Sequence, residues 1–313
     1  MNEFWHSPVL LTEVLAALAP KPGGRYIDAT IGGAGHAAAI LRATGYSGWL
    51  LGIDRDGDAL SAARERLAEL PGQVELRQGT FDRLAEWVAE ASCDGVLFDL
   101  GVSSPQLDRP ERGFGFRHDG PLDMRMDPSQ GTTAADLVNA APVEELTRIL
   151  VEYGEEPRAR KLARLIEQER KVHRLETTRQ LAELIERAVP RGGSRIHPAT
   201  RAFQALRIAV NDELAVLERG LASAVRVLRP GGRLAVITFH SLEARCVKRF
   251  GAERTRDYEY DGDVDVPELR RPRPPELRWV ERRAITAGAE ELARNPRARS
   301  AQLRVLEKEA HAS

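Results

Sequence analysis

Three short apolar runs in the first hundred residues each end in an aspartate, and helical patterns separate them. The runs are "RYID", which ends at Asp28, "GWLLGID", which ends at Asp54, and "GVLFD", which ends at Asp99. Continuous apolar strands that alternate with helices indicate a parallel sheet covered on both faces. The chain is therefore predicted to fold as an α/β protein with a doubly wound sheet.

The pattern is interrupted after Asp99, because the next buried strand, "RLAVITF", begins only at residue 233. One crossover helix needs far fewer residues than this gap contains. The gap holds a glycine- and proline-rich stretch (101–131) and then helical stripes, the last of which predicts one long helix ending near Leu228. We predict an α/β domain made of residues 1–105 and 201–313, and an inserted all-helical subdomain over 106–200. The tail "SAQLRVLEK" predicts a final strand at the sheet edge.

The net charge of −1 hides two basic segments. Residues 157–207 contain 13 Lys/Arg and 5 Glu, a net charge of +8, and residues 268–304 contain 10 Arg and 5 Glu, a net charge of +5. Such segments suggest a polyanionic partner, although solvated helix faces in an arginine-rich chain are the simpler alternative. Two cysteines are too few for a disulfide framework or a thiolate zinc site. With no apolar span and no signal peptide, a cytoplasmic protein without a membrane partner is expected.

The turn "DATIGGAGH" (28–36) follows the first strand. Its small residues let a ligand approach the backbone closely, although many α/β proteins use glycine only to turn tightly. Asp54, at the end of the second strand, is placed to bind ribose hydroxyls. Three carboxylates would repel the pyrophosphate of NAD, and the G-x-G-x-x-G register is missing. The three carboxylates suit a ligand with a ribose, an amino group and a sulfonium. This favours S-adenosyl-L-methionine as the cofactor.

Ordered blocks along essentially the whole chain resemble the bacterial ribosomal RNA small-subunit (cytosine-N4)-methyltransferase family, the RsmH or MraW type. The blocks include "HSPVLL" (6–11), "DATIGGAGH", "DLGVSSPQLD" (99–108), "RGFGF" (112–116), "IHPATRAFQALRIAVNDEL" (196–214), "LRPGGRLAVITFHSLE" (228–243) and "NPRARSAQLR" (295–304). The resemblance implies a class I, Rossmann-like fold and methylation of the exocyclic N4 of one cytidine in the decoding region of 16S rRNA. The implied partner is 16S rRNA within the small ribosomal subunit, and the insertion is the implied substrate-recognition subdomain.

The family's methyl-donor contacts carry over onto one set of positions in this sequence, namely Ala34, Gly35, His36, Asp54, Phe81, Asp99 and Gln106. The family usually has glycine at the position of Ala34. Alanine disfavours a positive φ, so Ala34 fits only if its backbone angle is ordinary. Because the rest of the loop matches, we expect donor binding to survive.

Methylation of N4 needs acceptors that hold the hydrogens of a poorly nucleophilic amine. The loop "DLGVSSPQLD" stands where other exocyclic-amine methyltransferases place an Asp/Asn-Pro-Pro-aromatic motif. The candidate catalytic residues are Asp99, Ser103, Ser104, Asp108 and His240. For His240, which follows the fifth strand, a helix cap is an equal alternative to a donor or a base.

Substrate contacts are predicted outside the turn at residues 28–36, here called the donor loop. Phe114 and Phe116 form either a stacking surface for a base taken out of its stack or the hinge of the insertion. His6 and Pro8 are expected to close the donor cavity, and His197 is a site residue or a satisfied core histidine. The proposed phosphate contacts are Arg125, Arg201 and Arg207.

Three alternatives stay open at this point. The first is a methyltransferase that acts on another RNA or on an acidic protein, and the second is a non-catalytic RNA-binding module. The third, an NAD oxidoreductase, lacks the pyrophosphate fingerprint. A vestigial donor site would predict loss of Asp54 or Asp99, and neither is lost. No metal site is predicted, and the oligomeric state is open, with a homodimer among the alternatives.

Overall fold

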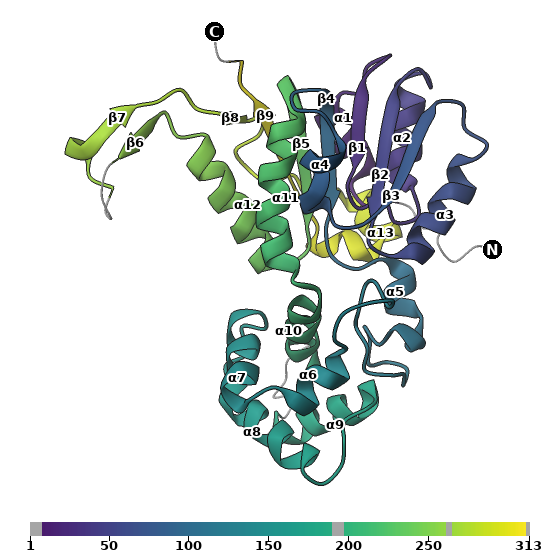
Figure 1. The fold of residues 1–313 in the computed structure, drawn as a ribbon, viewed down its shortest axis with the longest axis vertical. Helices are drawn as coiled ribbons and strands as arrows, with labels where there is room; N and C mark the ends of the chain where they lie inside the picture. Colours follow the sequence, from purple (N-terminus) through teal and green to yellow (C-terminus); the bar gives the residue numbers. More distant parts are fainter. Residues whose placement is uncertain (1–7, 190–196, 261–264, 311–313) are drawn as a thin grey trace. The chain divides into compact units, whose positions relative to one another are not determined.

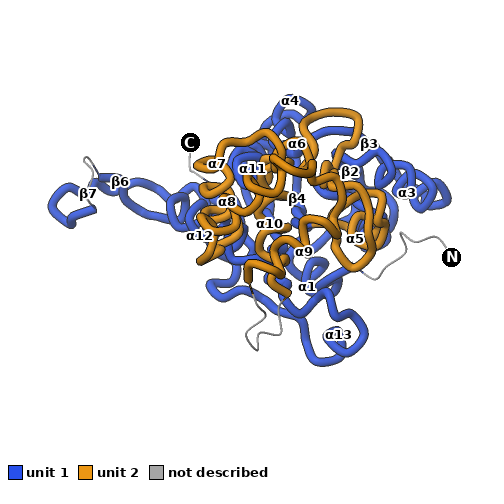
Figure 2. Tube along the Cα trace, turned by 90° about the horizontal axis from the view of Figure 1, so that it is seen from below, with its two compact units in different colours: residues 1–101, 214–313 blue, residues 102–213 orange. Residues whose placement is uncertain are grey.

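The computed structural model describes residues 8–189, 197–260 and 265–310. It divides the chain into two compact units, one formed by residues 1–101 and 214–313 and the other by residues 102–213 (Figure 2). The sequence analysis placed the insertion at 106–200. The helical unit is larger because the helix over 199–211 packs in its core and not in that of the α/β unit.

Unit 1 is built on a seven-stranded sheet with the order β3-β2-β1-β4-β5-β9-β8 (Figure 1). Its strands are β1 (Arg25–Asp28), β2 (Trp49–Asp54), β3 (Gln73–Gln78), β4 (Cys93–Asp99), β5 (Leu228–Thr238), β8 (Leu277–Trp279) and β9 (Gln302–Lys308). Strands β1 to β5 pair in parallel, and β9 pairs antiparallel with both β5 and β8. This is the class I, doubly wound topology that the sequence predicted.

The helices of unit 1 cover both faces of this sheet. They are α1 (Leu11–Leu18), α2 (Gly35–Ala43), α3 (Gly57–Leu67), the short η1 (Phe81–Arg83) and α4 (Leu84–Trp87), α11 (Glu213–Val227), α12 (Ser241–Arg254), α13 (Ala289–Arg294) and η4 (Pro296–Ser300). Alternate residues of each strand point to opposite faces. On β1, for example, Tyr26 packs in the cluster with α1, α2 and α3, whereas Ile27 packs in the cluster with α4, α11 and α12.

Three local predictions for unit 1 were wrong in detail. The sequence pattern from Phe81 to Ala91 predicts one helix, whereas the structure has the single turn η1 followed by α4, which ends at Trp87. The tail does form a strand, β9, but β8 and not β9 lies at the sheet edge. The fifth strand begins at Leu228, which already pairs with Cys93, and the Pro-Gly-Gly turn makes an irregularity inside it.

Unit 2 consists, in its described residues, of helices, loops and one isolated bridge, between Pro121 and Thr177. Its helices are α5 (Ser104–Asp108), η2 (Pro110–Arg112), α6 (Ala134–Ala140), α7 (Val143–Glu152), α8 (Ala159–Arg170), α9 (Thr178–Ala188) and α10 (Ala199–Asn211), and they enclose a separate apolar core. The long helix expected up to Leu228 is two helices, because Asp212 adopts the left-handed conformation (φ 51°) and ends α10.

A two-stranded ribbon leaves the body of unit 1 after α12 (Figure 1). It pairs β6 (Tyr258–Tyr260) with β7 (Arg270–Pro272), with the single turn η3 (Pro267–Leu269) ahead of β7. Within the described ranges, no helix is long and apolar enough to cross a membrane.

Candidate active site at the carboxyl edge of the sheet

The structure brings Asp28, Asp54 and Asp99 to one edge of the sheet, at the carboxyl ends of β1, β2 and β4. Asp28 lies opposite Gly52 on β2 and opposite Leu97 on β4. Asp54 and Asp99 therefore each extend two residues beyond Asp28, one on either side of it. The edge between β1 and β4 is the point at which the strand order reverses, where open α/β sheets bind their ligands.

Asp28 is 1% exposed and supports this edge from within. Its Oδ1 accepts a hydrogen bond from the Thr30 N–H at 3.4 Å. Burial and, to a smaller extent, the carboxylate of Asp54 raise the pKa of Asp28 to about 7, against the lowering effect of the Thr30 and Ala37 N–H groups. Asp28 is therefore a buried support for the loop that leads into α2.

Asp54 ties the donor loop to β2. Its Oδ2 accepts from the Gly32 N–H at 3.0 Å, and its Oδ1 accepts from the Asp56 N–H at 2.9 Å. Burial raises the pKa of Asp54 to about 6, although these two N–H groups lower it. Each carboxylate oxygen retains a second lone pair for a ligand hydroxyl.

Within the described part of the chain, Asp99 has an unpaired buried oxygen at this edge, which favours a bound ligand. Its Oδ1 is buried and has no hydrogen-bond partner among the described residues. Burial raises the pKa of Asp99, and together with the smaller effects of the carboxylates of Asp28 and Glu243 it brings the pKa to about 8. A buried acceptor without a partner costs about 1–3 kcal/mol, so a donor or a cation at this oxygen would be strongly favoured.

His36 faces Asp99 as a neutral ring. Its Nε2 lies 2.9 Å from the carbonyl oxygen of Val9, which only accepts, so the proton is on Nε2. Its Nδ1 lies 3.6 Å from Asp99 Oδ2. Burial lowers the pKa of His36 to about 4, so the ring carries no charge at neutral pH. The lone pair of Nδ1 therefore points toward a carboxyl group that is itself largely protonated.

Pro8, in the N-terminal segment, packs against Gly35 of the donor loop, and its role in closing a donor cavity stays a prediction, whereas His6 lies outside the described residues. A Cβ at Gly35 would come within 2.7 Å of Pro8 Cγ, so only glycine fits there. The carboxylate of Glu291 on α13 holds this segment, because its Oε1 accepts from the Leu10 N–H at 2.8 Å. Glu291 was not predicted from the sequence, because no spacing rule links positions 281 residues apart.

Ala34 does not have the ordinary backbone angle that the sequence analysis required. Its φ is 57° and its ψ 29°, which is left-handed, and its side chain is fully buried at the N-terminus of α2. The loop nevertheless closes with an Ala34 N–H bond to the Ile31 carbonyl at 2.7 Å. Alanine is therefore accommodated at a conformational cost of about 1–2 kcal/mol.

Phe81 is the first residue of η1, which follows the end of β3 at Gln78 after a two-residue connection. Its ring stacks on Phe98 of β4 at a centroid distance of 4.7 Å, and it leaves no space for a Cβ at Gly220 of α11. The ring is partly exposed, so it can offer an apolar surface at this end of the strand.

His240 is the N-cap of α12. Its Nδ1 accepts from the Glu243 N–H at 3.4 Å, while Glu243 Oε2 accepts from the His240 N–H at 3.3 Å. Its Nε2 lies 3.2 Å from the other oxygen of Glu243. The structure therefore has the capping arrangement and not a ring free to act as a base.

The remaining candidate residues lie on α5 of unit 2. Ser103 caps this helix, because its Oγ accepts from the Gln106 N–H at 3.4 Å and its N–H donates to Gln106 Oε1 at 3.0 Å. Gln106 is buried, Ser104 is half-buried and Asp108 is exposed. The side-chain oxygens of Ser103 and Gln106 are thus engaged in the helix cap.

Two of the three predicted phosphate contacts are paired within unit 2. Arg207 forms a two-pronged ion pair with Glu213 at 2.7 and 2.8 Å, and both side chains are mostly buried. Arg125 pairs in the same way with Asp123. Arg201, which is exposed, donates to the Glu155 carbonyl at 3.3 Å. Their placement as phosphate contacts was wrong for Arg207 and Arg125, because each guanidinium neutralises a neighbouring carboxylate.

The two phenylalanines of "RGFGF" belong to the core of unit 2. Phe114 is 6% exposed within it. Phe116 packs at its margin, with its ring 4.5 Å from the ring of His197 and 4.9 Å from that of Phe203. His197 is satisfied, since its Nε2 lies 2.8 Å from Glu186 and its Nδ1 accepts from the Ala199 N–H.

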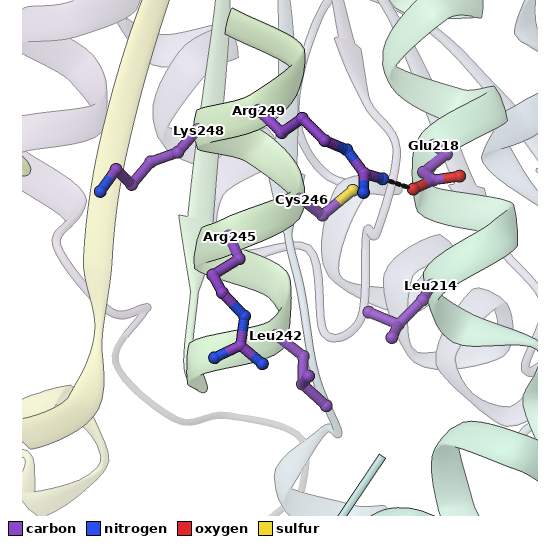
Figure 3. A pocket seen from close by; sticks show the side chains of 7 residues that line it. All are labelled: Leu214, Glu218, Leu242, Arg245, Cys246, Lys248 and Arg249. Carbon is purple, nitrogen blue, oxygen red and sulfur yellow. Dashed lines mark hydrogen bonds and ion pairs between the residues drawn. The ribbon is translucent and has the colours of Figure 1, made fainter. Parts of the chain in front are cut away.

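A groove between α11 and α12 of unit 1 is lined by residues other than the three aspartates (Figure 3). Arg249 reaches across it to pair with Glu218, and Leu214, Leu242 and Cys246 form its apolar side. None of the predicted donor-site residues lines it, and we assign no role to it.

Comparison with known proteins places the chain. The model of the MraW methylase family matches residues 3–309. The "Ribosomal RNA small subunit methyltransferase H" of Geobacter sp. strain M21 is 51% identical over 98% of this chain and 100% of its own length. The protein of the same name from Geobacter sulfurreducens is 52% identical over 97% and 99%. Among solved structures, a putative rRNA-methylase from Clostridium thermocellum is 13% identical over 97% of this chain and 99% of its own, with a TM-score of 0.46. Because the family model matches residues 3–309 and these two relatives are 51% and 52% identical over nearly the whole chain, the chain belongs to the MraW methylase family.

Proposed function

We propose that the protein transfers a methyl group from S-adenosyl-L-methionine to the exocyclic N4 of one cytidine in the decoding region of 16S rRNA, within the small ribosomal subunit. The observation that carries the proposal is the buried Oδ1 of Asp99, which has no partner within the described part of the chain, at an edge where Asp54 also ends a strand. An acidic edge of this kind suits a ligand with positive charge and ribose hydroxyls.

S-adenosyl-L-methionine fits the residues that are present. Asp54 would bind the ribose, Ala34, Gly35 and His36 would line the donor loop, and Phe81 would lie beside the adenine. When bound, the donor supplies an electrophilic methyl group on a sulfonium, so this site needs no further group to activate it. The neutral His36 adds no positive charge that would repel the donor.

Asp99 has two roles in this proposal. Its Oδ1 holds the positively charged end of the donor, and that charge favours the ionised carboxylate. The ionised oxygen is then an acceptor for a hydrogen of the cytosine amine. Asp108 and Ser104 are proposed as further acceptors in unit 2. Ser103 and His240 are less suited, because their acceptor atoms already cap helices.

Unit 2 is proposed as the substrate-recognition subdomain, and α8 is its best surface for RNA. The first two turns of α8 carry Arg160, Lys161 and Arg164 and no acid. Arg160 and Arg164 are exposed, and neither has a carboxylate within ion-pair distance among the described residues. Arg160→Ala/Arg164→Ala should lower affinity for small subunits and leave donor affinity unchanged. The control is Arg148→Ala, whose guanidinium already pairs with Glu145 and Glu152; equal effects would contradict this assignment.

The function is tested by mass spectrometry of 16S rRNA. A strain that lacks the gene should lack one N4-methylcytidine, and the wild-type gene should restore it. Asp54→Ala should abolish both restoration and donor binding in calorimetry. Asp58→Ala is the matched control, since Asp58 is an exposed aspartate four residues away, in the first turn of α3. Methylation that persists with Asp54→Ala would refute the proposed site.

A further inference from the structure

The carboxyl edge that carries Asp99 continues into the C-terminal part of unit 1. Asp99 pairs with Ile237 on β5, Ile237 pairs with Leu303 on β9, and Leu303 bridges to Ile285. These four residues form one row across the sheet. With neighbouring strands about 4.8 Å apart, Leu303 lies about 10 Å from Asp99 and Ile285 about 14 Å.

Arginines stand directly beside this row. Arg282 and Arg283 lie in the turn between β8 and Ile285, and Arg299 lies in η4, just before β9. All three are exposed. None has a carboxylate within ion-pair distance in the part of the chain that the structure describes, in contrast to Arg207 and Arg125. Residues 282–299 contain five Arg and two Glu, so the segment is basic as a whole.

The backbone that presents these arginines is fixed to the sheet. Ile285 and Leu303 exchange two backbone hydrogen bonds, at 2.9 and 2.8 Å. In η4, Ala298 is 1% exposed, and Asn295 Oδ1 accepts from the Arg297 N–H at 3.3 Å. The same segment also contains Glu291, whose carboxylate accepts from the Leu10 N–H in the N-terminal segment that packs on the donor loop. The guanidinium groups are therefore displayed from anchored turns beside the donor edge.

We propose that Arg282, Arg283 and Arg299 bind phosphate groups of the RNA chain next to the nucleotide that is methylated. The inference rests on the proposed function, since it names the surface of unit 1 that receives the same substrate. A nucleotide whose base enters the donor site must pass its flanking phosphates over the neighbouring part of this edge. Guanidinium groups bind phosphate oxygens in two-pronged pairs, and these three are not engaged with carboxylates.

The test measures binding of the full-length protein to small ribosomal subunits from a strain that lacks the gene, over a series of salt concentrations. Each lost phosphate contact should reduce the slope of log affinity against log salt by about 0.7–0.9. Arg299→Glu should weaken binding several-fold, and the triple reversal of Arg282, Arg283 and Arg299 about tenfold or more, with a smaller slope. The matched control is Arg64→Glu, an exposed arginine in the last turn of α3 with no acid in ion-pair range among the described residues.

Donor affinity, measured by calorimetry on the same samples, shows that each variant is folded and should be unchanged. The proposal is overturned if the triple variant binds subunits with the affinity and salt slope of Arg64→Glu while the wild type methylates them. It is also overturned if affinity falls without any change in slope, which would point to a protein contact. Failure of the proposed function looks different, because the wild type itself would then leave the cytidine unmethylated.

Discussion

The raised pKa of Asp99 predicts that donor binding depends on pH and releases a proton. In the free protein, burial and the nearby carboxylates of Asp28 and Glu243 raise this pKa to about 8. A positively charged donor binds the ionised form, so the apparent dissociation constant is the intrinsic one divided by the ionised fraction. That fraction is roughly one in ten at pH 7 and one in a hundred at pH 6, which is about 1.4 and 2.7 kcal/mol of lost affinity.

The assay is calorimetric titration with S-adenosyl-L-methionine between pH 6 and pH 9, in pairs of buffers with different ionisation enthalpies. Affinity should rise about tenfold per pH unit up to pH 8 and then level off, with close to one proton released at pH 7. Asp28 and Asp54, whose pKa values burial raises to about 7 and about 6, can only add in the same direction. His36 adds nothing, because its pKa is lowered to about 4.

Two comparisons decide whether Asp99 is responsible. Asp99→Asn should bind more weakly at pH 8.5 and should lose most of the pH dependence, since the amide cannot ionise. S-adenosyl-L-homocysteine, with a neutral sulfur, should show a shallower pH profile on the wild type. An affinity that is flat from pH 6 to pH 9, or an unchanged profile for Asp99→Asn, would refute the reasoning.

Three further predictions concern stability. Because the pKa values of Asp28, Asp54 and Asp99 are raised, the folded state binds protons more tightly than the unfolded chain. This stabilisation is complete below about pH 4 and is lost as pH rises through 6 to 8, so the melting temperature of the ligand-free protein should fall there and saturating donor should reduce the fall. Ala34→Gly should change the free energy of unfolding by less than about 1 kcal/mol in urea titration, because relief of the left-handed angle offsets the loss of a buried methyl group. Gly35→Ala should instead clash with Pro8 and weaken donor binding. Arg207→Glu should destabilise the protein by about 3 kcal/mol in the same titration, since it leaves Glu213 without its partner, and a loss below 0.5 kcal/mol would contradict the pairing.

The strands and the acidic edge could be predicted because each depends on a local pattern. A buried parallel strand is a short apolar run, and the residue that ends it lies at the carboxyl edge whatever the rest of the chain does. Asp28, Asp54 and Asp99 needed no knowledge of distant contacts. The small strand β8 and the ribbon of β6 and β7 were not predicted, because three-residue strands leave no periodic signal.

Two features of the structure, the helix caps at Ser103 and His240 and the break at Asp212, have a local signal in the sequence. Ser103 and Gln106 are three residues apart, as are His240 and Glu243, which is the spacing of a capping box. That spacing favours a helix start for Ser103 and His240 over a catalytic role. The break at Asp212 also had a signal, since aspartate after asparagine tolerates the left-handed angle that ends α10.

Other parts of the site depend on contacts that no local pattern reveals. Arg207 and Glu213 are six residues apart, so the rule for pairs within one helix does not link them, and they meet only because the chain turns at Asp212. The left-handed angle of Ala34 likewise follows from the packing of the loop and not from its own residue type. The sequence therefore predicts which residues lie at the edge of the sheet. It predicts less well which of their side chains are already engaged by other residues.

The carboxyl edge of unit 1 carries acidic residues along one part and arginines along another. This separation of charge matches a cationic donor and an anionic RNA. The acids lie at the ends of β1, β2 and β4, whereas Arg299 and Arg283 lie beyond β9 and β8. The two groups are roughly 10–14 Å apart by strand spacing, which exceeds the Debye length of about 8 Å at physiological salt. Each charge therefore acts on its own ligand, so one edge can hold a cationic donor and an anionic RNA chain without competition. Because the acids are buried or half-buried and the arginines are exposed, added salt should weaken RNA binding more than donor binding.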